Sequence, residues 1–264
     1  MPIKEIPKVL YKYRQWDNPF HSRILTNNEI FLSSPANFND PFDSSLPFKY
    51  KKEELTPENI YKKLIEVMRK YSPNISELEL QNFCYERQRS GIYESGEYWK
   101  EFYDDTKNQI FNDFGIMSLT TKNDNLLMWS HYANGHQGLC IGLDTEILFN
   151  TISGRLAPVF YSSSFPEIGL FEKDIRNWIQ LVNTKSKHWQ YEDEYRLTKT
   201  YSANMVFSFP KEMIKEIILG CSMKIEYKKE IYEIIDRNFP HAELFEAKTN
   251  IEDFMLDILH ITRL

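Results

Sequence analysis

The chain reads MWSHYANGHQG over residues 128–138 and then LCIGLD over residues 139–144. The first stretch places aromatic, polar and titratable side chains on what we expect to be a short helix. Gly135 and Gly138 predict a tight turn after it, and the apolar run that follows predicts a buried strand. Side chains at a helix end can converge on a ligand without disturbing a core. This part of the chain therefore predicts both a central strand and part of a site.

Two other stretches share this mixture of aromatic and charged residues. One is YKYR at residues 11–14, and the other is WQYEDEYRL at residues 189–197. Three such clusters, far apart along the chain, predict one composite site.

Composition narrows the class of protein. The chain has 264 residues, with 42% hydrophobic and 27% charged residues, which is ordinary for a soluble globular protein. No apolar run approaches the roughly 18 residues that cross a bilayer, and the first residues lack the apolar segment of a secretory signal. We therefore expect a cytoplasmic protein that does not bind membranes. A net charge of −6 argues against a broadly basic surface for non-specific nucleic-acid binding.

The order of patterns predicts an α+β fold in a single domain over residues 1–264, with a helical insertion at residues 50–112. In the insertion, Thr56-Pro57-Glu58 predicts a helix that Thr56 caps, and further helices are expected to begin near Ser76 and Gly96. A loop rich in Pro, Asn, Asp and Ser is expected over residues 33–43. Strands are expected at 8–13, 29–33, 114–119, 139–143, 157–161, 195–197, 205–207, 215–220, 243–247 and 255–260, and helices at 18–28, 171–182 and 225–237. They would form a split or half-barrel, antiparallel-rich sheet with helices inserted between the strands.

Two carboxylates mark the third cluster. If residues 192–194 are extended, Glu192 and Glu194 point the same way and face one cleft, while Asp193 points away. Neighbouring carboxylates can then hold different protonation states. The alternative is a solvated strand entrance at which Glu194 pairs with Arg196.

The helix of the opening stretch also has two interpretations. Trp129 and Tyr132 are three residues apart and would share one helix face, as packing residues do. His131 falls on another side, where it would be a site residue or a structural hydrogen-bonding group. His131 and His136 are five residues apart, which does not suit a metal pair on a helix, so no metal is expected. The cysteines at 84, 140 and 221 have no paired spacing and predict neither a disulfide nor a zinc site.

Arg14 ends a predicted strand, which is a frequent place for ligand contacts. Its alternative partner is Asp17 or Asp43 in an ion pair. Asn39-Asp40-Pro41 is a turn by default, with the Asx side chain bonding nearby backbone.

Taken in order, these segments resemble a large bacterial family of a domain of unknown function, family 2971. The resemblance rests on Leu10 to Arg14, on SPANFNDPF at residues 34–42, on Met128 to Gly138 and on Trp189 to Arg196. It runs over about residues 9–221.

The chain also resembles, more distantly, the ADP-ribosyltransferase superfamily. That resemblance implies a split sheet, with Lys12 to Arg14 on the first strand, Ser118 with His131 and Tyr132 in the middle, and Glu192 or Glu194 as the late acid. Lys12 stands where relatives of this shape often have His, and Arg14 is the other candidate for that role.

The implied chemistry consumes NAD as a substrate. Cleavage of the nicotinamide–ribose bond passes through an oxocarbenium-like state, which a carboxylate near the ribose stabilises. We therefore expect an NAD-consuming transferase or glycohydrolase that acts on an unidentified acceptor macromolecule, with toxin or phage-defence effector as its candidate biological role. The expected catalytic residues are Glu194, Glu192, His131 and Tyr132, and the expected nucleotide-binding residues are Tyr13, Arg14, Lys12, Asn39, Asp40, Ser118, Trp129, His136 and Arg196.

Two other function classes stay open from the sequence. One is a nuclease or other hydrolase of nucleic acid that uses His131, His136 and the acids at 192–194. The other is a non-enzymatic module that binds a nucleotide or a partner in the same place.

Overall fold

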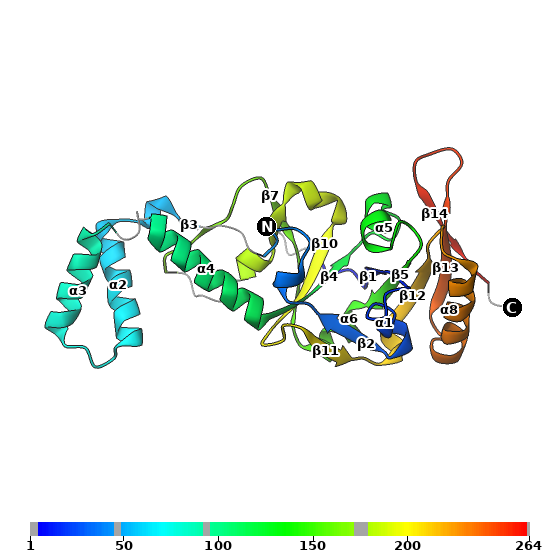
Figure 1. Cartoon of the computed structure of the whole chain (residues 1–264), viewed down its shortest axis with the longest axis horizontal. Coiled ribbons are helices and arrows are strands. Elements are labelled where there is room, and N and C mark those ends of the chain that lie inside the picture. The colour runs from blue at the N-terminus through cyan, green and yellow to red at the C-terminus, as the bar shows by residue number, and fades with distance from the viewer. Residues whose placement is uncertain (1–4, 45–48, 92–95, 172–178, 263–264) are drawn as a thin grey trace. The chain divides into compact units, whose positions relative to one another are not determined.

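The computed structural model describes residues 5–44, 49–91, 96–171 and 179–262. It is a mixed α/β structure with a large, mostly antiparallel sheet and several helices (Figure 1). None of the helices in these ranges is long and apolar enough to cross a membrane. The chain divides into two compact units: Met1–Asn37, Asp113–Tyr161 and Lys187–Leu264 form the first, and Phe38–Asn112 and Ser162–Ser186 form the second.

The first unit contains an eight-stranded sheet. Its strand order is β14-β13-β12-β5-β1-β4-β10-β6, and only β12 and β13 run parallel. The strands are β1 (Val9–Arg14), β4 (Phe114–Thr120), β5 (Leu139–Asp144), β6 (Arg155–Pro158), β10 (Glu194–Thr200), β12 (Ile214–Leu219), β13 (Glu243–Thr249) and β14 (Leu256–His260).

The apolar run at residues 139–143 lies in the central strand β5, and all five of its residues are buried, as predicted. It pairs with β1 on one side and with β12 on the other. A strand in the middle of a sheet that is covered on both faces needs apolar residues at successive positions. The two faces therefore belong to two cores. Leu139, Ile141 and Leu143 join the larger core, and Cys140 joins a smaller one.

Helix α5 (Leu126–Tyr132) covers the smaller core with Met128 and Trp129. The side chain of Asn125 caps it by accepting hydrogen bonds from two backbone N–H groups of the first turn. The chain then turns through three successive residues of positive φ, at 134–136, before β5 begins. A Cβ at Gly138 would lie 2.1 Å from the backbone oxygen of Arg14, so the close approach of the turn to β1 requires glycine.

The sheet is interrupted between β1 and β4. These neighbours share one pair of opposed residues, Tyr11 and Thr120, whereas β4 and β10 are paired from Phe114 to Thr120. Further along the same edge of β4, Ile116 exchanges two backbone hydrogen bonds with Ser33. Between these two contacts lies Ser118, the only residue of β4 that is not buried.

The C-terminal part of the sheet follows the predicted order of elements. Helix α8 (Ile225–Asn238) connects the parallel strands β12 and β13 and buries Ile231 and Ile235. A hairpin then joins β13 to β14, which forms one edge of the sheet.

The rest of the first unit holds shorter elements. The helix expected at 18–28 is mostly turn, because Asn18 caps only a local turn, and a helix forms only at Arg23–Thr26. The strand expected at 157–161 is divided at Val159, whose N–H bonds the backbone oxygen of Glu194. These elements are α1 (Arg23–Thr26), β2 (Glu29–Leu32), η1 (Pro35–Asn37), α6 (Thr145–Ile152), β7 (Phe160–Ser162), η4 (Lys187–Glu192), β11 (Met205–Ser208) and η5 (Lys211–Met213).

The second unit contains the helices expected after residue 56. Thr56 caps the first helix and accepts a hydrogen bond from Asn59 N–H, and Ser76 caps the second in a reciprocal capping box with Glu79. Residues 172–178 of the helix expected at 171–182 lie outside the described residues. The elements of this part of the chain are β3 (Lys49–Tyr50), η2 (Lys52–Glu54), α2 (Pro57–Tyr71), α3 (Glu77–Arg89), α4 (Gly96–Asp113), β8 (Glu167–Ile168) and β9 (Thr184–Ser186).

Candidate functional site

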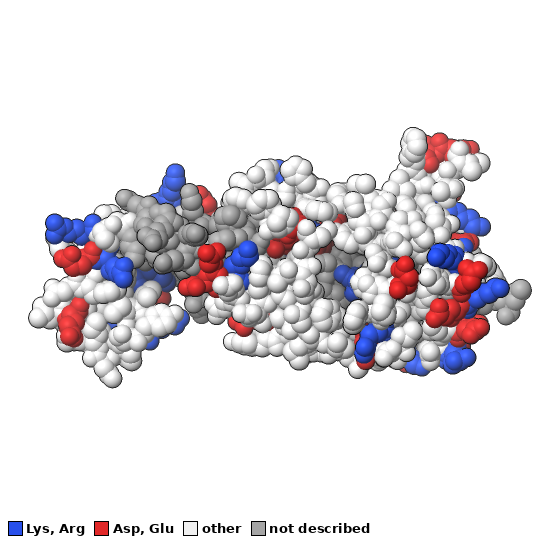
Figure 2. Space-filling view, in the orientation of Figure 1, with Lys and Arg blue, Asp and Glu red and all other residues white. Residues whose placement is uncertain are grey.

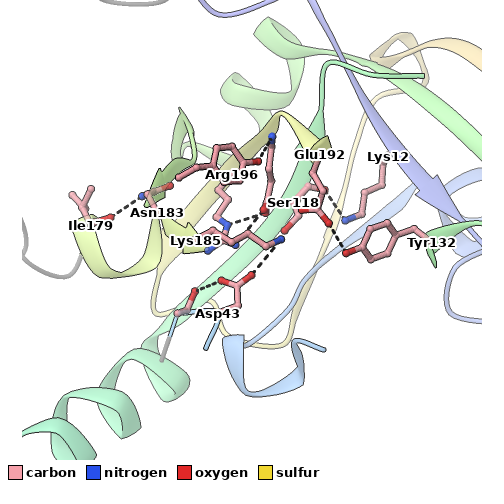
Figure 3. A network of polar contacts seen from close by, with 12 residues as sticks. Lys12, Asp43, Ser118, Tyr132, Ile179, Asn183, Lys185, Glu192 and Arg196 are labelled. Atoms are coloured by element: carbon pink, nitrogen blue, oxygen red, sulfur yellow. Dashed lines mark hydrogen bonds and ion pairs between the residues drawn. The ribbon is translucent and has the colours of Figure 1, made fainter. Parts of the chain in front are cut away.

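Glu192 is the acid that the structure connects to helix α5. It ends the short helix η4 and is 3% exposed. The phenol of Tyr132 donates a hydrogen bond of 2.7 Å to its Oε1 (Figure 3). The hydroxyl of Thr120 donates a hydrogen bond to the backbone oxygen of Glu192. The first contact fixes the carboxylate, and the second fixes the backbone beside the end of β4.

The expectation that residues 192–194 are extended is wrong. Glu192 ends a 3₁₀ helix, Asp193 has a positive φ of 41°, and only Glu194 begins a strand. Asp193 is held in this conformation by a hydrogen bond from the hydroxyl of Thr121. The two glutamates are both buried, but a turn relates them instead of the alternation of a strand.

Glu194 forms a buried ion pair with Arg196. Oε1 accepts from Nε at 2.8 Å and Oε2 from Nη2 at 3.3 Å, and the exposed fractions of the two side chains are 3% and 0%. The alternative in which these residues pair is therefore confirmed, but the pair is buried, not solvated. In register, Glu194 lies opposite Thr120 and Arg196 lies opposite Ser118, so the pair lies on the α5 face of the sheet beside the interruption.

Lys12 bridges the interruption between β1 and β4. Its ammonium donates a hydrogen bond of 2.6 Å to the backbone oxygen of Ser118. Along an antiparallel strand, every second residue turns its backbone N–H and C=O to the same edge. The backbone groups of Ser118 therefore point to the same edge of β4 as those of Ile116, two residues before it. The lysine thus bonds a carbonyl between the two contacts of this edge, where β4 has neither β1 nor Ser33 beside it.

Three aromatic rings form a cluster on the surface next to Glu192. The His131 ring lies 6.5 Å from the rings of both Trp189 and Tyr191, and these two lie 6.0 Å apart. His131 is exposed and the other two rings are partly exposed. Trp189 and Tyr191 were not among the predicted site residues, although the aromatic pattern WQYE could have indicated them.

Two of the predicted nucleotide-binding residues are instead buried. Tyr13 and Trp129 pack edge to face with ring centroids 5.1 Å apart, and both are at most 3% exposed. Burial also raises the pKa of the Tyr13 phenol, which donates to the backbone oxygen of Lys122. Neither ring can stack on a ligand without dismantling this core, so the core explanation holds for Trp129.

His136 contacts two residues of helix α5, the helix that contains His131. Its ring stacks on Trp129 at 6.3 Å, and its Nε2 lies 3.2 Å from the hydroxyl of Ser130. Burial lowers the pKa of His136. Nowhere in the described ranges do three His, Cys, Asp or Glu side chains gather as metal ligands would.

Arg14 does not join this cluster, which corrects the expectation that it converges with His131 and Glu194. In register Arg14 lies beside Leu139, which belongs to the core on the face opposite α5. Side chains alternate between faces along a strand, so Arg14 points away from Glu194. Lys12 starts from the same face as Arg14, but its ammonium reaches the gap between β1 and β4 at Ser118. Burial lowers the pKa of its guanidinium to about 10.

Asn39 and Asp40 belong to the second unit. Asp40 forms the turn expected by default, because its carboxylate accepts a hydrogen bond of 2.9 Å from the N–H of Phe42. Asp43, a proposed partner of Arg14, forms an ion pair with Lys185 in the same unit.

The first unit therefore combines a set of residues around one interruption of the sheet. Tyr132 holds the carboxylate of Glu192, Lys12 supplies a positive charge, and the His131 cluster supplies exposed rings. Such a set can bind a ligand that has a flat ring and a negative charge, and can stabilise positive charge that develops near a carboxylate.

The chain was compared with models of known protein families. A family model described as a protein of unknown function (DUF2971) matches residues 128–197, which run from α5 into β10. This match supports the resemblance to family 2971 over the part of the chain that contains Tyr132, His131 and both glutamates. No curated protein and no solved structure matches the chain.

Proposed function

We propose that the chain is an ADP-ribosyltransferase-like enzyme that consumes NAD, as a transferase or as a glycohydrolase. The observation that carries the proposal is the buried carboxylate of Glu192, fixed by the phenol of Tyr132 beside the interruption of the sheet between β1 and β4.

The chemistry requires an ionised carboxylate near the ribose. As the bond to nicotinamide breaks, positive charge spreads over C1′ and the ring oxygen, and a fixed negative charge lowers the energy of this state. In our proposal Glu192 supplies that charge. A hydrogen bond from Tyr132 to the ionised form favours it and holds it in place for the reaction.

Glu194 has a different role in the proposal. Both of its oxygens accept hydrogen bonds from Arg196, so its charge is already compensated. A carboxylate in a two-point ion pair with a guanidinium is poorly suited to stabilise a second cation. We therefore assign the catalytic role to Glu192 and a structural role to Glu194, as the partner of Arg196.

Lys12 and the aromatic cluster supply binding. The ammonium of Lys12 would attract the diphosphate of NAD, and the rings of His131, Trp189 and Tyr191 would stack on nicotinamide or adenine. These assignments replace Arg14, Tyr13 and Trp129, which the sequence suggested for the same purposes.

The test is an incubation of the purified chain with NAD that carries a label in its adenine. Free nicotinamide in the solution, with the label in free ADP-ribose, indicates a glycohydrolase; label on a macromolecule indicates a transferase. Absence of nicotinamide release, together with absence of NAD binding by calorimetry, rejects the proposal. Cleavage of RNA or DNA without NAD, tested in parallel, would favour the hydrolase alternative.

A further inference from the structure

The two edges of the large sheet differ in how they are protected against pairing. The β6 edge carries the exposed residues Arg155 and Pro158, and both residue types discourage the addition of a strand. The β14 edge, with sequence LDILH, has neither proline nor lysine. Its one acidic residue, Asp257, lies opposite Lys248 of β13 and accepts hydrogen bonds from Asn250. The β14 edge is therefore open to a further strand in the described part of the chain.

Backbone hydrogen bonds show which residues of β14 face outward. The N–H of Ile261 donates to Leu244, and the backbone oxygen of Met255 accepts from Asn250. Odd-numbered residues thus bond β13, so the alternation of an antiparallel strand turns the backbone groups of Leu256, Ile258 and His260 to the open edge.

The side chains of these outward-facing positions share one face. Leu256 is buried in the smaller core, Ile258 packs against that core, and the His260 ring contacts Phe245 at 5.3 Å. A strand added to this edge would pack beside these three side chains. It would also find a free direction for backbone hydrogen bonds at every second residue of β14.

The hairpin tip beside this edge is also apolar. Ile251 and Phe254 are fully exposed, and Met255 and Leu259 are 47% and 46% exposed. In Figure 2 the tip projects at the upper right, with acidic atoms among uncharged ones. Exposure of several large apolar side chains at one place is typical of an interaction surface.

We infer that β14 pairs with β14 of a second copy of this chain, antiparallel and centred on Ile258. In this register Ile258 lies opposite its own counterpart, and Leu256 lies opposite His260. About six backbone hydrogen bonds form between the outward-facing residues. The edge is self-complementary because this register places no like charges opposite one another: Ile258 meets Ile258, and the only carboxylate of the strand, Asp257, accepts hydrogen bonds from Asn250 of its own chain. This complementarity supports a second copy of the chain as the partner.

The test measures mass in solution and uses charges at the centre of the strand. By light scattering at about 100 µM, the wild-type chain is expected at twice the chain mass of 31.6 kDa. Ile258→Glu and Ile258→Lys each place like charges opposite one another, so each variant is expected to be a monomer. An equimolar mixture of the two is expected to recover the dimer, because opposite charges then face one another.

Tyr201→Glu, a substitution at an exposed residue after β10, is the matched control and is expected to leave the dimer intact. The recovery on mixing also separates a loss of pairing from a loss of folding, since an unfolded variant cannot recover. A wild-type monomer at all concentrations, or variants that stay monomeric when mixed, would overturn the inference.

Discussion

Tyr132 and Glu192, which lie 60 residues apart in sequence, are joined by a hydrogen bond of 2.7 Å from the phenol to Oε1. Tyr132 is the last residue of α5, and Glu192 is the last residue of η4. The contact therefore connects α5, the helix that follows β4 in the chain, to the turn that precedes β10.

Replacement of Tyr132 by Phe is expected to remove this bond and leave the fold intact. The free energy of unfolding should fall by about 1 kcal/mol, and the kcat/KM for nicotinamide release should fall about tenfold, because the carboxylate is no longer held in one position. Tyr232→Phe on α8 is the control. Equal kcat/KM for Tyr132→Phe and the wild type would show that the bond is not used in catalysis.

The ion pair of Glu194 with Arg196 is expected to be required for stability. Glu194→Gln leaves a buried guanidinium without its carboxylate, which should lower the free energy of unfolding by about 3 kcal/mol. The double variant Glu194→Gln/Arg196→Met should recover much of this loss, because neither charge of the pair remains. Urea unfolding of the three proteins measures both effects, and a stable single variant would contradict this role.

The aromatic cluster is expected to determine substrate affinity. Trp189→Ala should raise the KM for NAD about tenfold with little change in kcat, since stacking on a ring is worth about 1 kcal/mol or more. Tyr191→Ala should act in the same direction. Steady-state kinetics measures both constants. A fall in kcat at unchanged KM would place these rings outside the binding step.

The chain should lose stability in mildly acidic solution through His21. Burial, with the positive charges of Arg14 and Lys12, lowers the pKa of His21 from 6.5 to about 4. The neutral ring also accepts a hydrogen bond from Gln15 N–H. Since the unfolded chain binds the proton first, this contribution is complete above pH 6.5 and is lost as the pH falls towards 4.

The variant His21→Asn removes the contribution of His21 to the pH dependence of stability. Between pH 7 and pH 5 the urea midpoint of the wild type should fall more than that of the variant. If the variant loses as much stability as the wild type over this interval, other groups account for the loss.

The local sequence pattern predicted most of the strands and the starts of most helices. Alternation of apolar and polar residues, apolar runs and capping residues each depend only on residues close together in the chain. It could not predict the turn at Asp193, because a positive φ at a non-glycine residue follows from its contact with Thr121. Nor could it predict which face Arg14 occupies, because that depends on the register of β1 with β5. The cluster of His131 with Trp189 and Tyr191 likewise depends on residues far apart in the chain.

The most direct test of the proposed function is the rate of nicotinamide release from NAD by the wild type and by Glu192→Gln. Gln keeps an oxygen that accepts the hydrogen bond of Tyr132, so the two proteins should unfold at similar temperatures. We expect release by the wild type and a rate at least about 100-fold lower for the variant, because the negative charge is lost. Equal rates for the two folded proteins, or no release by the wild type, would contradict the assignment of Glu192.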